Sequence, residues 1–136
     1  MIYEFELKEK AIGKARPRFS YKMGRMYTPS ATQKFEQKVK NAFLEKYTLK
    51  ELSDKPIKAV IIAEFEPPKS ISKKKRLELI EEVIDYTKKP DIDNISKIIL
   101  DALNGIAYKD DNQISKLEVI KRYSYENKII VKLEEN

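Results

Sequence analysis

The sequence predicts an α/β fold, a single-domain two-layer sandwich in which helices pack on a small mixed β-sheet. The first observation is length, because 136 residues fit one compact domain, residues 1–136. The second is composition, because 41% hydrophobic residues are enough for a globular core. The third is that apolar residues recur with strand and helix periods in the order β, α, β, α, α, β, β, which is typical of a helix-covered sheet.

The first part of the chain predicts a strand, a long loop and a helix. Residues 2–7 alternate apolar and acidic side chains, which indicates a half-buried strand. Residues 8–30 are basic and aromatic and predict a long loop with short strands, and loops of this length are usually functional or disordered. Ser30 is expected to begin a helix that runs to about residue 47, with Gln33 in the reciprocal capping-box position.

The strongest strand pattern lies at residues 57–66. Val60 and Ile62 are apolar on the face opposite the main apolar set, so we expect a central strand with both faces covered. Ser72 is expected to cap a Lys-rich helix at about residues 73–84. The inner face of that helix is expected to carry Leu77, Ile80 and Ile84.

The last part of the chain predicts one strongly one-sided helix and two strands. The helix is expected at about residues 94–104, with Gly105 as its C-terminal stop. Residues 113–124 and 128–134 predict a hairpin that turns at residues 126–127. The apolar face of the helix is expected to be Ile95, Ile98, Ile99, Ala102 and Leu103.

The charge balance favours a polyanionic partner, nucleic acid first. The chain carries 28 Lys and Arg against 22 Asp and Glu, a net charge of +6, with a pI near 9.3. The alternative is a soluble protein that is simply rich in Lys and Glu, because charged residues reach 37%.

Several function classes are excluded. The chain has no Cys and no His, which excludes disulfides, thiolate zinc sites and Ser-His or Cys-His catalysis. No apolar run approaches the ~18 residues of a transmembrane helix. Because the first residues read as an acidic strand, we expect no secretory signal. We therefore expect a cytoplasmic protein with no membrane partner.

The most informative segment is Lys88–Lys97. Pro90 keeps the chain extended, and in an extended segment Asp91 and Asp93 point the same way. Asn94 and Lys97 follow one helical turn apart, at a helix N-terminus that favours a phosphate nearby. Two carboxylates and an amine are thus expected at one point. The alternative is that these acids only cap the helix.

A second acidic pair, Asp110-Asp111, follows the same helix. The loop that joins this helix to the acidic pair must fold back along the helix if Asp111 is to join Asp91 and Asp93. Carboxylates without His or Cys suit Mg²⁺, with Mn²⁺ as a possible substitute, rather than Zn²⁺. Such an ion polarises a phosphodiester and activates water, and Lys97 could stabilise charge on the phosphate. The alternative for this pair is ordinary turn chemistry.

The loop of residues 8–30 predicts a nucleic-acid contact. Its cations alternate with Phe19, Tyr21 and Tyr27, and cations with rings suit phosphates and bases. The alternative is a solvated loop whose rings pack on the core. The Lys-rich helix start is a weaker signal of the same kind. The expected DNA-binding residues are Lys14, Arg16, Arg18, Lys22, Arg25, Lys73 and Lys74.

Three motifs together resemble the RusA family of Holliday-junction resolvases. They are Asp91–Lys97 with the pattern D-x-D-N-x-x-K, Asp101–Gly105 with D-A-L-x-G, and Tyr108–Ile114, which holds the spaced D-D. Gly13–Arg18 and Tyr27–Pro29 also resemble the N-terminal region of that family. The resemblance covers most of the chain.

The resemblance implies site residues, a cofactor and an assembly. By position, it implies Asp91, Asp93 and Asp111 as metal-binding catalytic acids and Lys97 as the catalytic lysine, while Asp110 matches an acid of less certain role. Family members are Mg²⁺-dependent, often prophage-encoded homodimers that cut four-way DNA junctions by paired symmetric nicks. A two-fold dimer would offer one site to each of the two equivalent cuts.

Three functional hypotheses remain at this point. The leading one is a junction-resolving endonuclease that acts on branched DNA in recombination and repair. The second is a non-catalytic basic nucleic-acid-binding module in which the acids are caps. The third is a metal-dependent hydrolase of small phosphoesters, against which the large basic loop argues.

Overall fold

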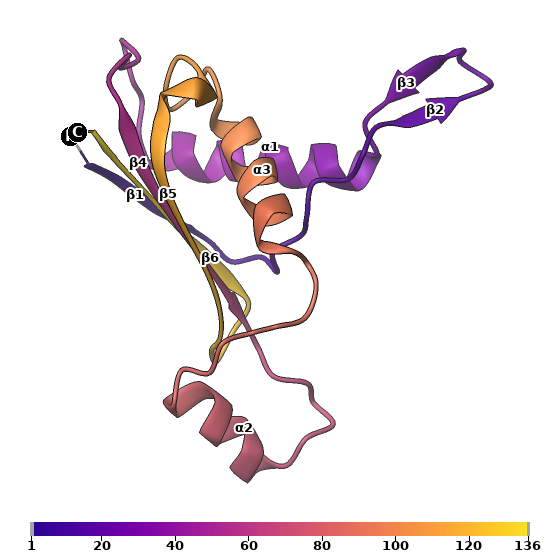
Figure 1. Ribbon diagram of the computed structural model, residues 1–136, viewed down its shortest axis with the longest axis vertical. Coiled ribbons are helices and arrows are strands. Elements are labelled where there is room, and N and C mark those ends of the chain that lie inside the picture. The colour runs from indigo at the N-terminus through magenta and orange to yellow at the C-terminus, as the bar shows by residue number, and fades with distance from the viewer. Residues whose placement is uncertain (1, 136) are drawn as a thin grey trace.

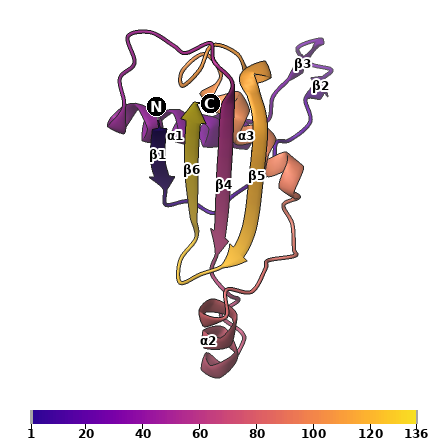
Figure 2. The same cartoon turned by 60° about the vertical axis from the view of Figure 1, so that its left-hand side comes forward.

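The computed structural model describes residues 2–135 and shows a mixed four-stranded sheet with helices packed on one face (Figure 1, Figure 2). The strands are β1 (Ile2–Leu7), β4 (Ile57–Phe65), β5 (Ile114–Tyr123) and β6 (Lys128–Glu135), in the order β1-β6-β4-β5. β4 is parallel to β5 and antiparallel to β6, and β6 is antiparallel to β1. The predictions of a mixed sheet and of an internal β4 are confirmed.

The prediction that the last two strands form a hairpin is wrong, because β4 lies between β5 and β6. Their short connection crosses the end of β4. There, the Ser124 N–H donates to the Phe65 carbonyl at 2.9 Å, and the Glu66 N–H donates to the Asn127 side chain at 3.0 Å. In the central place, β4 pairs along its length with β5 on one edge and with β6 on the other.

Two helices, α1 (Ser30–Lys46) and α3 (Ile92–Leu103), cover one face of the sheet (Figure 2). They enclose one hydrophobic core with the inward residues of the strands. On the opposite face of β4, Val60 and Ile62 are only half-buried. The prediction that both faces of this strand are covered is therefore confirmed for one face only. No helix within residues 2–135 is long and apolar enough to cross a membrane. The predicted apolar set of α3 is buried throughout, at 0% exposure for Ile95, Ile98, Ile99, Ala102 and Leu103.

The start of α1 agrees with the prediction, but the capping box does not form. Pro29 holds the N-cap position and no side chain caps the helix. Ser30 is already the first helical residue, so its hydroxyl does not take the capping place. Gln33 instead donates from its side-chain amide to the Thr28 carbonyl at 3.2 Å.

The third helix, α2 (Lys73–Glu81), projects beyond one end of the sheet (Figure 1). Ser72 caps it as predicted, accepting from the Lys75 N–H at 3.2 Å. The predicted inner face is wrong in two of three positions, because Leu77 is 45% and Ile84 is 38% exposed while Ile80 is buried. Ile84 lies beyond the end of α2 at Glu81, and Ile80 is the one buried residue of the helix.

The long loop contains a small hairpin of β2 (Arg18–Ser20) and β3 (Arg25–Tyr27). These strands pair only with each other, and the hairpin projects from the body of the molecule (Figure 1). Gly24 lies in its turn with a φ of +65°, a conformation that other residues rarely adopt.

The loop after α3, residues 104–113, folds back along the helix. Gly105 takes a φ of +77° just past the helix end, as expected for a C-terminal stop. Tyr108 is fully buried, and its hydroxyl donates to the Leu100 carbonyl in the last turn of α3. Burial raises the pKa of Tyr108 above its ordinary value, and nearby acids, Asp111 first, add to this. The hydroxyl therefore stays protonated and available as a donor.

We predict that Tyr108→Phe lowers the free energy of unfolding by about 1–2 kcal/mol, because the buried Leu100 carbonyl loses its donor. Thermal or urea unfolding measures the change. Tyr125→Phe is the matched control, because Tyr125 is 63% exposed, and it should change stability by less than about 0.5 kcal/mol. Equal stability of the two variants would contradict the anchoring role of Tyr108.

Candidate functional site

The N-terminus of α3 is held in place by residues 84–90, which run beside β5. The Tyr86 N–H donates to the Lys121 carbonyl at 3.0 Å. The Lys121 amine in turn donates to the carbonyls of Lys88, at 2.6 Å, and Pro90, at 2.8 Å. These bonds fix the point at which the chain enters α3.

The two acids at this point are not used as helix caps. Asp91 occupies the N-cap position, but its side chain makes no capping hydrogen bond. Asp93 lies in the first turn. Both residues are exposed, and within residues 2–135 neither carboxylate has a hydrogen bond or ion pair with another side chain or the backbone. The capping alternative therefore does not account for their side chains.

One face of α3 carries a polar stripe. Asp93, Lys97 and Asp101 are spaced by four residues, so they lie on the same side of the helix, opposite the buried apolar set. Lys97 is exposed, and within the described chain its amine forms no ion pair. Two acids therefore flank an unpaired cation along one helix face.

The long loop forms a wall beside this stripe. The Lys14 N–H donates to the Asn94 carbonyl at 3.1 Å. A Cβ at Gly13 would lie 3.0 Å from the Asn94 Cβ, so the close approach of loop and helix depends on glycine. The cavity between them has a volume of about 270 Å³ and is lined by Lys14, Ala15, Arg16, Pro17, Asn94 and Lys97.

Lys14 ties the loop to both helices. Its amine lies 2.5 Å from Glu36 of α1 and 3.5 Å from Asp101 of α3. Burial alone would lower the pKa of Lys14, but the hydrogen bond with Glu36 and the charges of Glu36 and Asp101 raise it. The amine is therefore charged and already paired. Its predicted contact with DNA stays a prediction.

The fold-back loop brings the second acidic pair to the same stripe. A side-chain hydrogen bond with Asp110, slight burial and the charges of Asp110 and Asp101 raise the pKa of Asp111, while Lys97 lowers it. Asp111 thus lies within electrostatic range of both Asp101 and Lys97. Folding back was the condition for Asp111 to approach the helix.

Asp110 also has the structural role that turn chemistry offered as an alternative. Its carboxylate accepts from the Asn112 N–H at 3.3 Å. Its own N–H donates to the Gln113 side chain at 2.8 Å. The pair forms a reciprocal cap of a short 3₁₀ turn, Asp111–Gln113.

The chemistry of the donors fits a hard divalent ion, because the groups are carboxylates without a competing His or Cys. Within residues 2–135, however, no three acids lie close enough together to hold a metal ion. Asp101 lies eight positions beyond Asp93 in the helix, about 12 Å along the axis. The metal set of Asp91, Asp93 and Asp111 therefore stays a prediction.

The residue that the sequence analysis left without a role is Asp101. It bridges to Lys14 at 3.5 Å and acts on the pKa of Asp111. Its spacing of four residues from Lys97 and eight from Asp93 was a signal that could have placed it on the same helix face.

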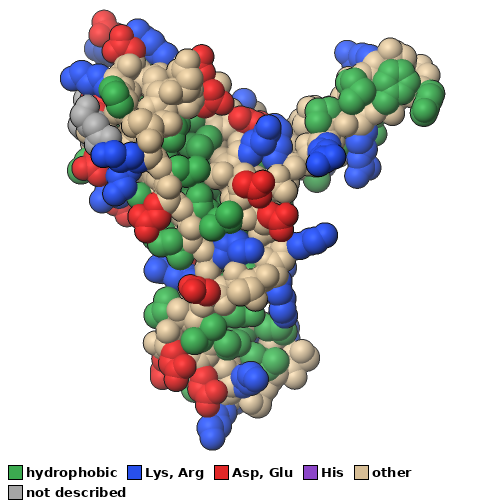
Figure 3. Space-filling model, in the orientation of Figure 1, with side chains coloured by type: hydrophobic (Ala, Val, Ile, Leu, Met, Phe, Trp, Pro, Cys, Tyr) green, Lys and Arg blue, Asp and Glu red, His purple; other side chains and the backbone are tan. Residues whose placement is uncertain are grey.

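The predicted DNA-binding residues fall into three places. Lys14 and Arg16 line the cavity beside α3, whereas Arg18, Lys22 and Arg25 are exposed on the projecting hairpin. Lys73 and Lys74 are exposed on α2, at the other end of the molecule (Figure 1). Lys and Arg side chains are visible on both projections in Figure 3. The structure does not bring the α2 lysines to the α3 cavity.

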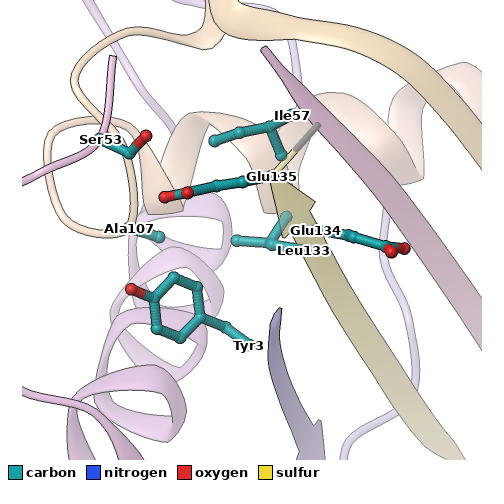
Figure 4. A pocket seen from close by; sticks show the side chains of 7 residues that line it. All are labelled: Tyr3, Ser53, Ile57, Ala107, Leu133, Glu134 and Glu135. Atoms are coloured by element: carbon teal, nitrogen blue, oxygen red, sulfur yellow. The ribbon is translucent and has the colours of Figure 1, made fainter. Parts of the chain in front are cut away.

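A second hollow lies where β1 begins and β6 ends (Figure 4). It is lined by Tyr3, Ser53, Ile57, Ala107, Leu133, Glu134 and Glu135 and is too narrow to admit a water molecule. It is therefore a packing gap and has no room for a substrate.

Comparison with known proteins agrees with the motifs. The family model described as endodeoxyribonuclease RusA matches residues 9–134, which include the long loop, α3 and the fold-back loop. An uncharacterized protein of Bacillus subtilis (strain 168), YqaN, is 31% identical over 136 residues, which is 97% of this chain and 95% of YqaN. The chain belongs to the RusA family of endodeoxyribonucleases.

Proposed function

We propose that this chain is a divalent-metal-dependent endonuclease that resolves four-way DNA junctions by paired symmetric nicks. The observation that carries the proposal is a group of exposed side chains at the N-cap and on the first two turns of α3, which have no partner within residues 2–135: Asp91, Asp93 and Lys97. Lys97, together with Asn94, lines a cavity walled by the basic loop. Membership of an endodeoxyribonuclease family supports the same activity.

In this proposal the chain's own groups hold the scissile phosphate. The free N–H groups and dipole of the α3 N-terminus favour the anion. Lys97 stabilises negative charge as it develops on the phosphate. Asp91, Asp93 and Asp111 would hold Mg²⁺ or Mn²⁺, which supplies polarisation of the phosphodiester and activation of water when bound. The fold-back loop would have to move for Asp111 to join the other two acids, because within residues 2–135 no three acids lie close enough together to hold a metal ion.

The basic residues hold the DNA on either side of the cut. Arg16 lines the cavity itself, and the hairpin and α2 extend the basic surface in two directions (Figure 3). Contacts of Lys and Arg with phosphates position DNA without reading its sequence. We therefore expect binding to weaken steeply as salt rises.

A four-way junction also requires two equivalent cuts. A two-fold homodimer places one active site at each of two symmetric strands, so we propose that the active form is a homodimer. Branched DNA arises in recombination and repair, of the chromosome or of a prophage, which places the proposed activity in the cytoplasm.

The second candidate function is a non-catalytic module that binds branched DNA. The separation of the acids within residues 2–135 favours it, as does the capping role of the Asp110 carboxylate. It differs in one observable: such a module would bind junctions in a salt-dependent way and would cut none with any divalent ion.

We predict that Asp93→Asn reduces junction cutting by more than about 100-fold, because several kcal/mol of charge stabilisation depend on the metal that the carboxylate would hold. Junction affinity in a gel-shift assay should stay within about twofold, since phosphate contacts supply most of it. Asp85→Asn is the matched control, with the same charge change on an exposed residue outside the stripe. Wild-type cutting by Asp93→Asn would remove this residue from the site.

Chelation should separate binding from cutting in the wild-type protein. With EDTA, a labelled four-way junction should be shifted but not nicked, and added Mg²⁺ should restore symmetric nicks. The reason is that the basic surface needs no cation to attract phosphates, whereas the acids of the polar stripe need a bound cation for the cutting step. Cutting that persists in EDTA would contradict a metal-dependent mechanism.

Lys97→Met should slow cutting by about 10²–10³-fold, the usual effect of removing one donor to a developing charge. The variant keeps the length of the stem, and Lys97 is exposed, so the unfolding midpoint should not change. Lys116→Met serves as the control, because Lys116 is an exposed lysine on β5. Single-turnover cleavage at saturating protein measures the step without a contribution from binding. An equal rate for the two variants would argue against the assigned role.

A further inference from the structure

The projecting hairpin carries an unusual amount of exposed apolar surface. The segment of residues 16–27, which we name the arm, is exposed at every position except Ser20. Single exposed apolar residues are ordinary on a protein surface, but a cluster of large ones marks a binding site. The exposed fractions are Phe19 48%, Tyr21 93%, Met23 51%, Met26 57% and Tyr27 37%.

The two faces of the arm differ in chemistry. Phe19 pairs with Met26 across the hairpin, and residues directly opposite each other share a face. The other face carries Arg18 opposite Tyr27 and Ser20 opposite Arg25. One face is thus apolar and the other is mainly basic, and Figure 3 shows hydrophobic and basic side chains side by side on this projection.

The rings at the tip are already arranged for contact. The rings of Phe19 and Tyr21 meet edge to face, with centroids 5.0 Å apart and planes at 81°. The turn that carries Tyr21 is closed by the Gly24 N–H donating to the Ser20 carbonyl at 2.7 Å, and the Met23 N–H donates to the Ser20 hydroxyl at 3.1 Å. A preorganised pair of rings loses little further freedom on binding.

Charge identifies the partner of this surface. From residue 10 to residue 35 the chain has no acidic residue, and Lys and Arg occupy seven of these positions. A protein-binding surface of the same size would be expected to have few charges at its centre, whereas stacking rings among cations are the composition of a surface for unpaired nucleotides. The ligand that fits is DNA with an exposed base.

The arm is linked directly to the candidate site. Pro17, at the base of the arm, lines the cavity beside α3. Tyr21 lies four positions beyond Pro17 along the chain, about 13 Å at the usual rise of a strand. DNA rises 3.4 Å per nucleotide of one strand, so the tip lies roughly four nucleotides from the cavity.

We propose that the arm recognises the branch itself, by stacking Phe19 and Tyr21 on a base that the branch exposes. In a continuous duplex both faces of each base are covered by neighbours, but at a branch point the stack is interrupted and a face becomes available. The basic face of the arm contacts the adjoining phosphates. This inference rests on the proposed function and adds the element that distinguishes a junction from a duplex.

The test compares a ring-deleted arm with the wild-type protein on two DNAs. The DNAs are a four-way junction with 2-aminopurine beside the branch and a linear duplex of the same sequence, both titrated in EDTA so that neither is cut. The double variant Phe19→Ala/Tyr21→Ala should lose junction affinity by about tenfold or more, the effect of losing one stacked base. Its duplex affinity should stay within about twofold.

Fluorescence and two controls separate stacking from other effects. Wild type should change the 2-aminopurine signal of the junction, and the double variant should not. Tyr21→Phe keeps the ring and should retain the preference for the junction over the duplex. Lys22→Ala removes a charge and should lower the affinity for both DNAs by the same factor. Tyr125→Ala, an exposed ring on another loop, should change neither.

Three outcomes overturn the proposal in distinguishable ways. If the double variant prefers the junction as wild type does, the arm does not recognise the branch, and Mg²⁺-dependent cutting by wild type leaves the proposed function intact. If wild type itself neither prefers nor cuts the junction, the proposed function fails together with this inference. If the double variant loses affinity for the junction and the duplex equally, and its mass in sedimentation differs from that of wild type, the arm is a contact between copies of this chain.

Discussion

Burial of the apolar side of α3 against the sheet determines where the candidate site lies. Ile95, Ile98, Ile99 and Leu103 have no exposed surface, and burying four such side chains contributes about 6–12 kcal/mol, comparable to the whole stability of a domain. A rotation of the helix by one residue would expose part of this surface. The polar stripe must therefore lie on the side of α3 away from the core, where Lys97 lines the cavity, and its position is set by the core rather than by contacts among the acids.

Most helices and strands could be predicted because each has a local pattern of apolar residues. The pairing of the strands could not, because the hairpin signal of residues 113–134 is local, whereas β4 separates β5 from β6 through contacts far apart in the sequence. The same limit explains α2. The one-sided pattern places Leu77 on the apolar side of the helix, but it does not show whether another part of the chain packs against that side. Local signals give the elements, and tertiary contacts decide their neighbours.

Asp91 is the N-cap of α3 and Asp93 lies in its first turn, so the prediction that both acids lie in an extended segment after Pro90 is wrong. The shared helix face of Asp93 and Lys97 could still be predicted from their spacing of four residues. The role of Lys14 could not, since its ion pairs with Glu36 and Asp101 depend on the packing of a loop between two helices. The approach of the fold-back loop depends on the buried Tyr108, whose hydroxyl donates to the Leu100 carbonyl. No motif in the sequence predicts this hydrogen bond.

The distribution of charge separates binding from chemistry. Acids gather on the polar stripe and on the fold-back loop beside it, whereas the arm carries only cations among its charged residues. On the loop, a hydrogen bond with Asp110 first, and then slight burial and the charges of Asp110 and Asp101, raise the pKa of Asp111. A phosphate near the stripe would be repelled over a short range, because salt screens exposed charges beyond about 8–10 Å. The tip of the arm lies farther away, at about 13 Å from the cavity, so its attraction for DNA is little reduced by the acids. In the proposed function, a cation at the stripe would be needed for cutting but not for holding the DNA, so the acids would control the reaction rather than the affinity.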